Sequence, residues 1–235
     1  MNEKTHQKLR NKLRSLIALL LLPTVGTAQT MQWKEEVKLH DGKVIIADRF
    51  YNLGGYPGYE SRERVALDET VTFHLSDGKD VVWKSDFRDS SPEPNSLNHF
   101  RFDVVDGVPY LATYPAGCIA YNKWGRPNPP QVLLRFERGS WLRIGVKELP
   151  SVIVGAKANV VVGRPASSLL RGLYSIDDVI EKDRYIMSNQ YDTVLVQPQS
   201  HAESQCPNLV YYKGAWVEPG DSIGKKLMDQ RFKNK

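Results

Sequence analysis

The chain has 235 residues, of which 32 are basic and 27 acidic, for a formal net charge of +5. Residues 1–28 hold five of the basic residues and one of the acidic ones, which leaves 27 basic and 26 acidic residues and a net charge of +1. These remaining charges are mixed along the chain, as on an ordinary solvated surface, so we expect no nucleic-acid partner. Only the tail is locally basic, with Lys225, Lys226, Arg231, Lys233 and Lys235, which fits the C-terminus of a helix and a frayed end at least as well as a binding patch.

The first 28 residues have the organisation of a secretory signal peptide. A positive segment contains Lys4, Lys8, Arg10, Lys12 and Arg14. It is followed by the apolar run 16–22 and by small residues that end at Ala28. The run is shorter than the roughly 20 residues that span a membrane. We therefore predict cleavage after Ala28 and a periplasmic or secreted chain without a membrane span. An uncleaved anchor, or a start at Met31, remains the alternative.

Residues 29–235 are predicted to form one domain, in which β-favouring runs alternate with turns that contain glycine. Hairpins are predicted around the turns 40–43, 76–79, 106–107 and 137–140, with a fifth candidate around 213–214. We expect a mainly β fold, with antiparallel hairpins in a sandwich or barrel-like sheet. The similar aromatic positions after the fourth and fifth turns, Trp141 and Trp216, keep an irregular small β-propeller as the alternative.

Two or three short helices complete the expected fold. Ser175 and Asp178 match a capping box, which predicts a helix from Ile176 to about Lys182. A second helix is predicted from Asp221 or Ser222 to Phe232, with Ile223 and Leu227 on the stripe that would dock on a sheet. The segment 166–173 is a weaker candidate.

The two cysteines outside the leader are Cys118 and Cys206. An even number of cysteines in an exported protein predicts one disulfide between them. The alternative, a nucleophilic thiol at Cys118, would require a neighbouring base, and no catalytic signature surrounds this residue.

Two loops have the composition of binding surfaces. The loop 51–59 is rich in Gly and Tyr, and the loop 114–130 combines Tyr, Trp, Arg and Pro. Aromatic side chains and arginine are the residue types that anchor recognition sites. We predict Tyr121, Trp124 and Arg126 as binding residues; the alternative is that these side chains pack over the rim of the sheet.

The opening W-K-E-E-V-x-L-x-D-G at 33–42 and the run P-Y-L-A-T-x-P-A-G-C-I-A-Y-N-K-W-G-R-P-N-P-P at 109–130 are distinctive. On these motifs the chain resembles a family of uncharacterised exported proteins of Gram-negative bacteria. The resemblance implies a place in the bacterial envelope and brings no activity with it.

Known catalytic and cofactor patterns do not occur in the sequence. The histidines outside the leader, His40, His74, His99 and His201, lack the spacing of metal ligands. There is no G-x-S-x-G elbow, and the segment 220–226 departs from a phosphate-binding loop. We expect neither a metal nor another cofactor.

Three functions are compatible with these features. The first is a non-catalytic binding or interaction protein of the cell envelope, whose partner is another envelope protein. The second is a structural or assembly component of the envelope. The third is an envelope hydrolase with a dispersed active site, which predicts a cleft with paired carboxylates or a His–acid pair.

Overall fold

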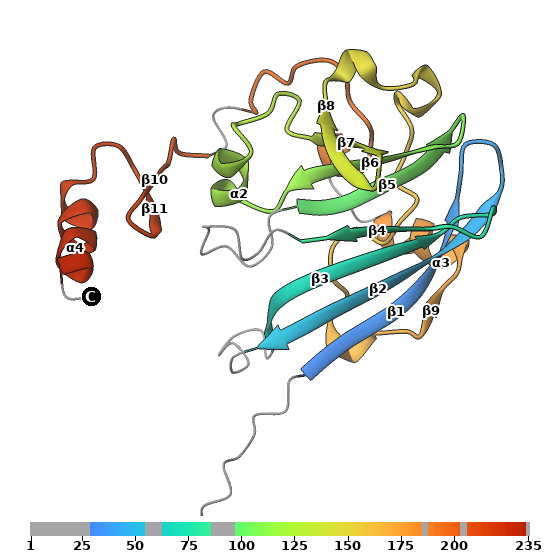
Figure 1. Cartoon of the computed structure of the whole chain (residues 1–235), viewed down its shortest axis with the longest axis horizontal. Coiled ribbons are helices and arrows are strands. Elements are labelled where there is room, and N and C mark those ends of the chain that lie inside the picture. Colours follow the sequence, from blue (N-terminus) through green and yellow to red (C-terminus); the bar gives the residue numbers. More distant parts are fainter. Residues whose placement is uncertain (1–28, 55–62, 86–96, 185–187, 203–205, 234–235) are drawn as a thin grey trace, which may run out of the picture.

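The computed structural model describes residues 29–54, 63–85, 97–184, 188–202 and 206–233. The leader with its predicted cleavage point lies outside these residues, as does the part 55–59 of the Tyr-rich loop. The described chain forms two β-sheets stacked face to face, with a C-terminal hairpin and helix that stand apart from them (Figure 1). In this part of the chain, no helix has the length and apolar character needed to cross a membrane.

The first sheet has the strand order β4-β3-β2-β1-β9. Its strands are β1 (Gln29–Lys38), β2 (Val44–Gly54), β3 (Val65–His74), β4 (Asp80–Lys84) and β9 (Leu173–Tyr174). The first four form an antiparallel meander, and β9 pairs with β1 in parallel. Gly42 and Gly78 have φ values of 84° and 83° in the turns after β1 and β3, which explains the Asp-Gly pairs found there.

The second sheet has the order β5-β6-β7-β8, with antiparallel pairing throughout. Its strands are β5 (Leu97–Val105), β6 (Val108–Pro115), β7 (Val132–Glu137) and β8 (Ser140–Ile144). Asp106 and Gly107 have positive φ values of 52° and 75° and form the two-residue turn between β5 and β6. Two consecutive positive φ values suit the right-handed twist of a tight hairpin.

The main hydrophobic core lies between the two sheets. Alternate residues of β1 point inward, and Val37 is fully buried together with Val71 of β3. Phe73 of the first sheet stacks on Phe102 of the second with a ring-centroid distance of 3.8 Å. Complete burial of a phenylalanine side chain contributes about 1.5–3 kcal/mol to the free energy of folding, so this aromatic contact helps to hold the two sheets together.

Polar contacts also join the edges of the sheets. The indole Nε1 of Trp141 in β8 donates to the carbonyl of Val82 in β4 at 2.9 Å. On the other side, Nδ2 of Asn159 donates to the carbonyls of Lys38 (2.9 Å) and Phe102 (2.8 Å). The architecture is therefore a sandwich with bridged edges, and the two sheets keep separate strand orders.

The five predicted hairpins are confirmed, and four of them build the two facing sheets. The shared core between these sheets agrees with the predicted sandwich and differs from the propeller alternative.

The described α-helices are α2 (Cys118–Lys123), α3 (Ile176–Asp183) and α4 (Ser222–Lys233). The capping box of α3 is confirmed, since Ser175 Oγ accepts from the backbone N–H of Asp178 at 3.3 Å. The weaker helix candidate 166–173 does not form: the segment holds the 3₁₀ turn η3 (Ser167–Leu169) and the first residue of β9, and serines favour turns over helix interiors. Helix α2 was not predicted. The other 3₁₀ turns are η1 (Val146–Glu148), η2 (Ser151–Ile153) and η4 (Asn189–Tyr191).

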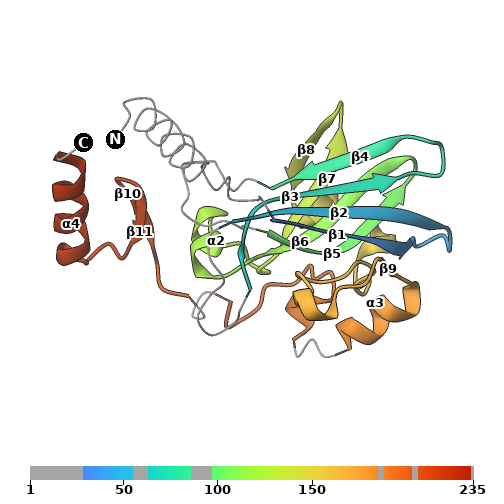
Figure 2. The same ribbon diagram turned by 90° about the horizontal axis from the view of Figure 1, so that it is seen from below.

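Residues 206–233, which we call the C-terminal arm, contain the hairpin β10 (Val210–Tyr212) and β11 (Ala215–Val217) followed by α4. Both views show the arm projecting from one end of the sandwich (Figures 1 and 2). The predicted docking of the Ile223–Leu227 stripe on a sheet is wrong, since these side chains are 73% and 54% exposed. A periodic pattern identifies an apolar stripe and does not identify what covers it.

Candidate functional site

Three turns meet at the end of the sandwich opposite the C-terminal arm. They are the β1–β2 turn with Asp41, the β3–β4 turn with Asp77 and the β5–β6 turn with Asp106 (Figure 1). Because the first two turns belong to one sheet and the third to the other, the gap between the sheets opens here. The side chains leave a cavity of about 400 Å³, which we call the turn-end groove.

The turn-end groove has an apolar floor and a polar rim. The floor continues the core between the sheets and consists of Leu39, Ile45, Leu75 and Val104. The rim carries His40, Asp41, Lys43, Ser76, Asp77 and Asp106 with Gly107. An apolar concave surface with a few polar groups at its edge is the usual composition of a binding site, and the volume lies in the usual range.

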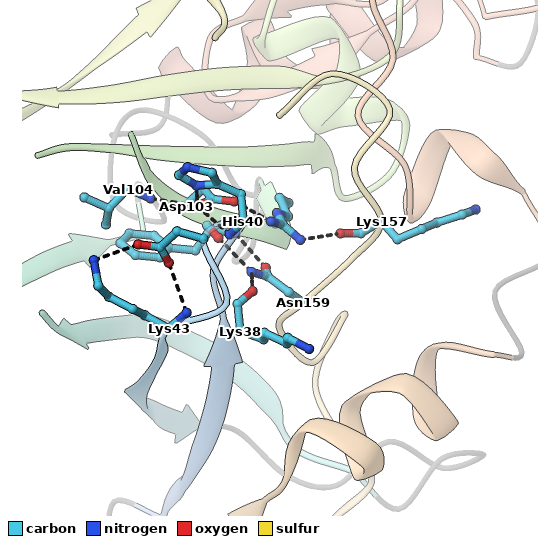
Figure 3. Close-up of polar contacts among 10 residues, drawn as sticks. Lys38, His40, Lys43, Asp103, Val104, Lys157 and Asn159 are labelled. Atoms are coloured by element: carbon cyan, nitrogen blue, oxygen red, sulfur yellow. Dashed lines mark hydrogen bonds and ion pairs between the residues drawn. The ribbon is translucent and has the colours of Figure 1, made fainter. Parts of the chain in front are cut away.

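His40 is the most constrained polar side chain of the groove. Its Nδ1 lies 2.7 Å from Oδ1 of Asp103, and its backbone N–H donates to the same oxygen at 3.2 Å (Figure 3). The Asp103 side chain is fully buried, and it also accepts from the backbone N–H of Val104 and from the guanidinium of Arg101. An ionised carboxylate only accepts hydrogen bonds, so Nδ1 of His40 carries the proton.

The other ring nitrogen of His40 is the one available for recognition. The side chain is 24% exposed, and Nε2 has no hydrogen-bond partner within the described chain. With Nδ1 protonated, the neutral ring presents Nε2 as an acceptor. His40 and Leu39 also line a second cavity of about 250 Å³, bordered by Arg101, Asn159 and Ile180. His40 therefore separates two adjoining cavities.

The position of His40 is fixed by the segment that follows the second sheet. Asn159 donates to the carbonyl of Lys38 at the end of β1, and its Oδ1 accepts a hydrogen bond from the backbone N–H of Phe102 at 2.9 Å. Arg101 donates to the carbonyl of Lys157 at 3.1 Å, so the residues that support Asp103 are also tied to this segment (Figure 3). A side chain supported in this way is pre-organised for binding.

The rim is acidic. Asp41 accepts from Lys43 at 2.7 Å, and hydrogen bonds from the Lys43 side chain and backbone lower the pKa of Asp41. Lys79 acts in the same way on Asp77, whose pKa is also lowered. Asp106 is exposed and forms no ion pair with the described residues. The lining residues comprise three carboxylates and one lysine, a net charge of −2 with His40 neutral, which becomes −1 when Lys79, the partner of Asp77, is counted.

A buried cluster of charged residues lies elsewhere between the sheets. Arg49 donates through Nε to Glu35 at 3.0 Å, through Nη1 to Glu69 at 2.6 Å and through Nη2 to the carbonyl of Val161 at 2.7 Å. Glu35 accepts from the backbone N–H of Val161 at 2.8 Å. The side chains of Arg49, Glu35 and Glu69 are each at most 2% exposed. The cluster thereby binds the segment around Val161 to β1 and β2.

The pKa values fit a cluster that is fixed in its charged form. Burial alone would raise the pKa of Glu69, but the interactions with His99 and Arg49 outweigh it and hold the pKa at about 2. Burial lowers the pKa of His99, whose Nδ1 lies 3.0 Å from Nη1 of Arg49. A neutral imidazole accepts this hydrogen bond from the guanidinium. We interpret the cluster as structural.

The predicted binding residues lie at the other end of the molecule, around α2. Tyr121 is 5% exposed, and the guanidinium of Arg126 lies 5.0 Å from its ring centre. Arg126 donates to the carbonyls of Cys206 (3.0 Å) and Pro207 (2.9 Å). Trp124 packs partly buried against the main core. These residues anchor the C-terminal arm, and the structure does not bring them to the turn-end groove; their role in binding stays a prediction.

The predicted disulfide joins the same two regions. Cys118, at the start of α2, is bonded to Cys206, with the two Cα atoms 5.3 Å apart and a sequence separation of 88. Asn122 adds a hydrogen bond from its Nδ2 to the carbonyl of Pro207 at 3.0 Å. A covalent bond and several hydrogen bonds thus attach the arm to α2.

Sequence reasoning missed the pair His40–Asp103, because its members are 63 positions apart and no motif spans them. For the buried cluster a signal was present. Glu35 occupies the same parity in β1 as the inward-facing Trp33 and Val37, and a charged residue at an apolar position indicates a buried partner.

Comparisons of the chain with protein-family models, with curated proteins and with solved structures find no match. Within the described ranges, no group of three or more His, Cys, Asp and Glu side chains is arranged to hold a metal ion.

Proposed function

We propose that this protein is a non-catalytic binding protein of the cell envelope, and that it recognises its partner through the turn-end groove. The observation that carries the proposal is the combination of an apolar floor with His40, whose ring is held by the buried Asp103. The floor offers apolar contact area to a ligand. The fixed imidazole and the carboxylates would orient that ligand and select for a complementary charge on it.

The compartment is part of this proposal. A disulfide persists in the oxidising space outside the cytoplasm, and the Cys118–Cys206 bond fits that environment. The leader 1–28 with cleavage after Ala28 would deliver the chain to the periplasm. The partner we expect is another envelope protein, because the groove lies among exposed turns that a second protein can reach.

The experiment is a comparison of three full-length baits in envelope extract. Ser76 is an exposed rim residue, so Ser76→Arg fills the groove and reduces its negative charge by one without disturbing the core. Ser140→Arg introduces the same side chain at the exposed start of β8, which does not line the groove, and serves as the matched control. We expect one dominant partner that the wild type and the control retain and that Ser76→Arg loses. Equal capture by all three baits contradicts the proposal.

An envelope hydrolase is the second candidate, and the His40–Asp103 pair beside a cavity is the observation that favours it. An acid-oriented imidazole with a solvent-facing Nε2 has the arrangement of a general base. His40→Gln distinguishes the two candidates, since it would abolish turnover of a captured substrate in the hydrolase and only weaken capture in the binding protein.

The further alternative, a structural component of the envelope, would remain with the insoluble envelope after fractionation.

A further inference from the structure

The C-terminal arm has an apolar surface without a partner in its own chain. Ile223 and Leu227 are one helical turn apart on α4 and are 73% and 54% exposed. The side of α4 that carries Asp229 faces the hairpin, because Asp229 accepts from the hydroxyl of Tyr212 at 2.9 Å and pairs with Lys213. The Ile223–Leu227 stripe lies away from Asp229 on the helix and is turned outward.

This stripe belongs to a basic element. Helix α4 (Ser222–Lys233) contains four basic residues and one acidic residue, a net charge of +3. The acidic residue, Asp229, is already paired with Lys213 of the hairpin. Lys226 is exposed and follows Ile223 by three residues, which places it beside Ile223 on the helix surface. The outward face of α4 therefore combines apolar side chains with positive charge.

The turn-end groove has the complementary character. Its floor is apolar, and its rim is negative, with a net charge of −1 when Lys79, the partner of Asp77, is counted. Asp41 and Asp77 are paired with lysines, whereas Asp106 is exposed and forms no ion pair with the described residues. Opposite potentials that flank apolar surfaces are the pattern of paired docking surfaces.

The arm of one molecule is remote from its own groove. The disulfide Cys118–Cys206 and the hydrogen bonds of Arg126 attach the arm beside α2. Figures 1 and 2 both show α4 and the three turns at opposite ends of the sandwich. Docking of α4 in the groove is therefore a contact between molecules.

We propose that α4 of one copy docks in the turn-end groove of a second copy, with the Ile223–Leu227 stripe on the floor and Lys226 beside the rim carboxylates. This inference rests on the proposed function in one respect, that the groove is a recognition site. The contact joins different surfaces of the two copies, so each molecule keeps one free arm and one free groove, and association continues head to tail. A single short helix buries little area, so the contact is weak and depends on concentration.

The test is sedimentation equilibrium of the full-length, disulfide-bonded protein between about 10 µM and about 1 mM, the range of weak interfaces of this size. The arm variant is Ile223→Glu with Leu227→Glu, and the groove variant is Ser76→Arg. Leu169→Glu, at a side chain 72% exposed outside the arm and the groove, is the control. We expect the wild type and the control to form a concentration-dependent series of oligomers. Each of the other two variants raises the dissociation constant at least about tenfold.

The decisive sample is a mixture of the arm variant with the groove variant. The first keeps an intact groove and the second an intact arm, so an equimolar mixture regains one functional contact per pair. We expect it to form 1:1 dimers and no larger species, at concentrations where each variant alone associates at least about tenfold more weakly than the wild type. A wild type that is monomeric throughout, or a mixture that stays monomeric, overturns the inference. Neither result affects the extract experiment, in which a different protein can still require the groove.

Discussion

Nδ1 of His40 lies 2.7 Å from a carboxylate oxygen of Asp103 that is wholly shielded from solvent. This hydrogen bond connects the exposed β1–β2 turn of the first sheet to a buried side chain of β5 in the second sheet. The same bond selects the ring tautomer in which Nε2 is an acceptor. In the function proposed above, one carboxylate therefore supports both the architecture and the recognition surface.

Replacing Asp103 with Asn should therefore affect stability and the imidazole together. The Arg101 guanidinium, whose side chain is 12% exposed, would lose its buried carboxylate, and we expect a loss of about 3 kcal/mol in the free energy of unfolding. The ¹⁵N shifts of His40 should change from a single tautomer to a mixture. The control is His40→Gln, which leaves the Arg101–Asp103 pair in place and should cost about 1 kcal/mol or less. A tautomer unchanged in Asp103→Asn would contradict this role.

Removal of Arg49 should be among the most damaging single changes. Arg49→Met leaves the carboxylates of Glu35 and Glu69 buried without a cation, which costs about 3–5 kcal/mol. Arg135→Met removes a guanidinium whose partner Glu137 is 43% exposed, and such surface pairs contribute about 1 kcal/mol or less. Urea unfolding of the two variants measures the difference. Similar losses in both would show that the cluster is not the anchor we describe.

The pH dependence of stability should contain a contribution from Asp183. Burial raises the pKa of this carboxyl to about 7, with Glu35 acting in the same direction and Lys182 and Arg49 opposing it. The pKa in the folded protein exceeds the ordinary value of 3.8, so the folded state holds the proton more tightly. Its stabilising contribution is present below pH 3.8 and is lost as the pH rises toward and through 7.

Asp183→Asn removes this titration. The variant should be more stable than the wild type at pH 8, and the difference between them should shrink or reverse as the pH falls from 7 to about 4. Asp177→Asn, at an exposed position of α3, is the matched control. A constant difference between Asp183→Asn and the wild type across this range would argue against a buried titrating carboxyl.

Reduction of the disulfide should free the C-terminal arm before it unfolds the sandwich. The Cys118–Cys206 bond closes a loop of 88 residues, which in the chain-entropy model corresponds to about 4–5 kcal/mol. With Arg126→Ala in addition, the remaining attachment is weakened, and limited proteolysis should cut between the sandwich and β10. Mass spectrometry of the fragments identifies the cleavage point. An arm that stays protected after both changes would require a further attachment.

The sequence was informative where the chemistry is local. Asp-Gly pairs and glycine turns predicted the hairpins, because positive φ values restrict the residues at those positions. The capping box predicted α3, because Ser175 and Asp178 satisfy each other's backbone donors. In each case the determining residues are at most a few positions apart.

The features that depend on long-range contacts were not predicted. Strand β9 has two residues and exists through its pairing with β1, about 140 residues earlier in the chain. Helix α2 is a single short element beside the disulfide, within a segment whose prolines favour extended backbone. The turn-end groove arises because three turns from two sheets meet, and no single segment carries that information.

The central claim is that the turn-end groove contacts another protein, and site-specific photocrosslinking in the envelope of a Gram-negative host tests it most directly. The full precursor would carry Ser76→p-benzoylphenylalanine in one strain and Ser140→p-benzoylphenylalanine in another. We predict a discrete protein adduct after irradiation from position 76, identified as a second copy or a different envelope protein by mass spectrometry, and none from position 140. No adduct from position 76, or the same adducts from both positions, would contradict the account.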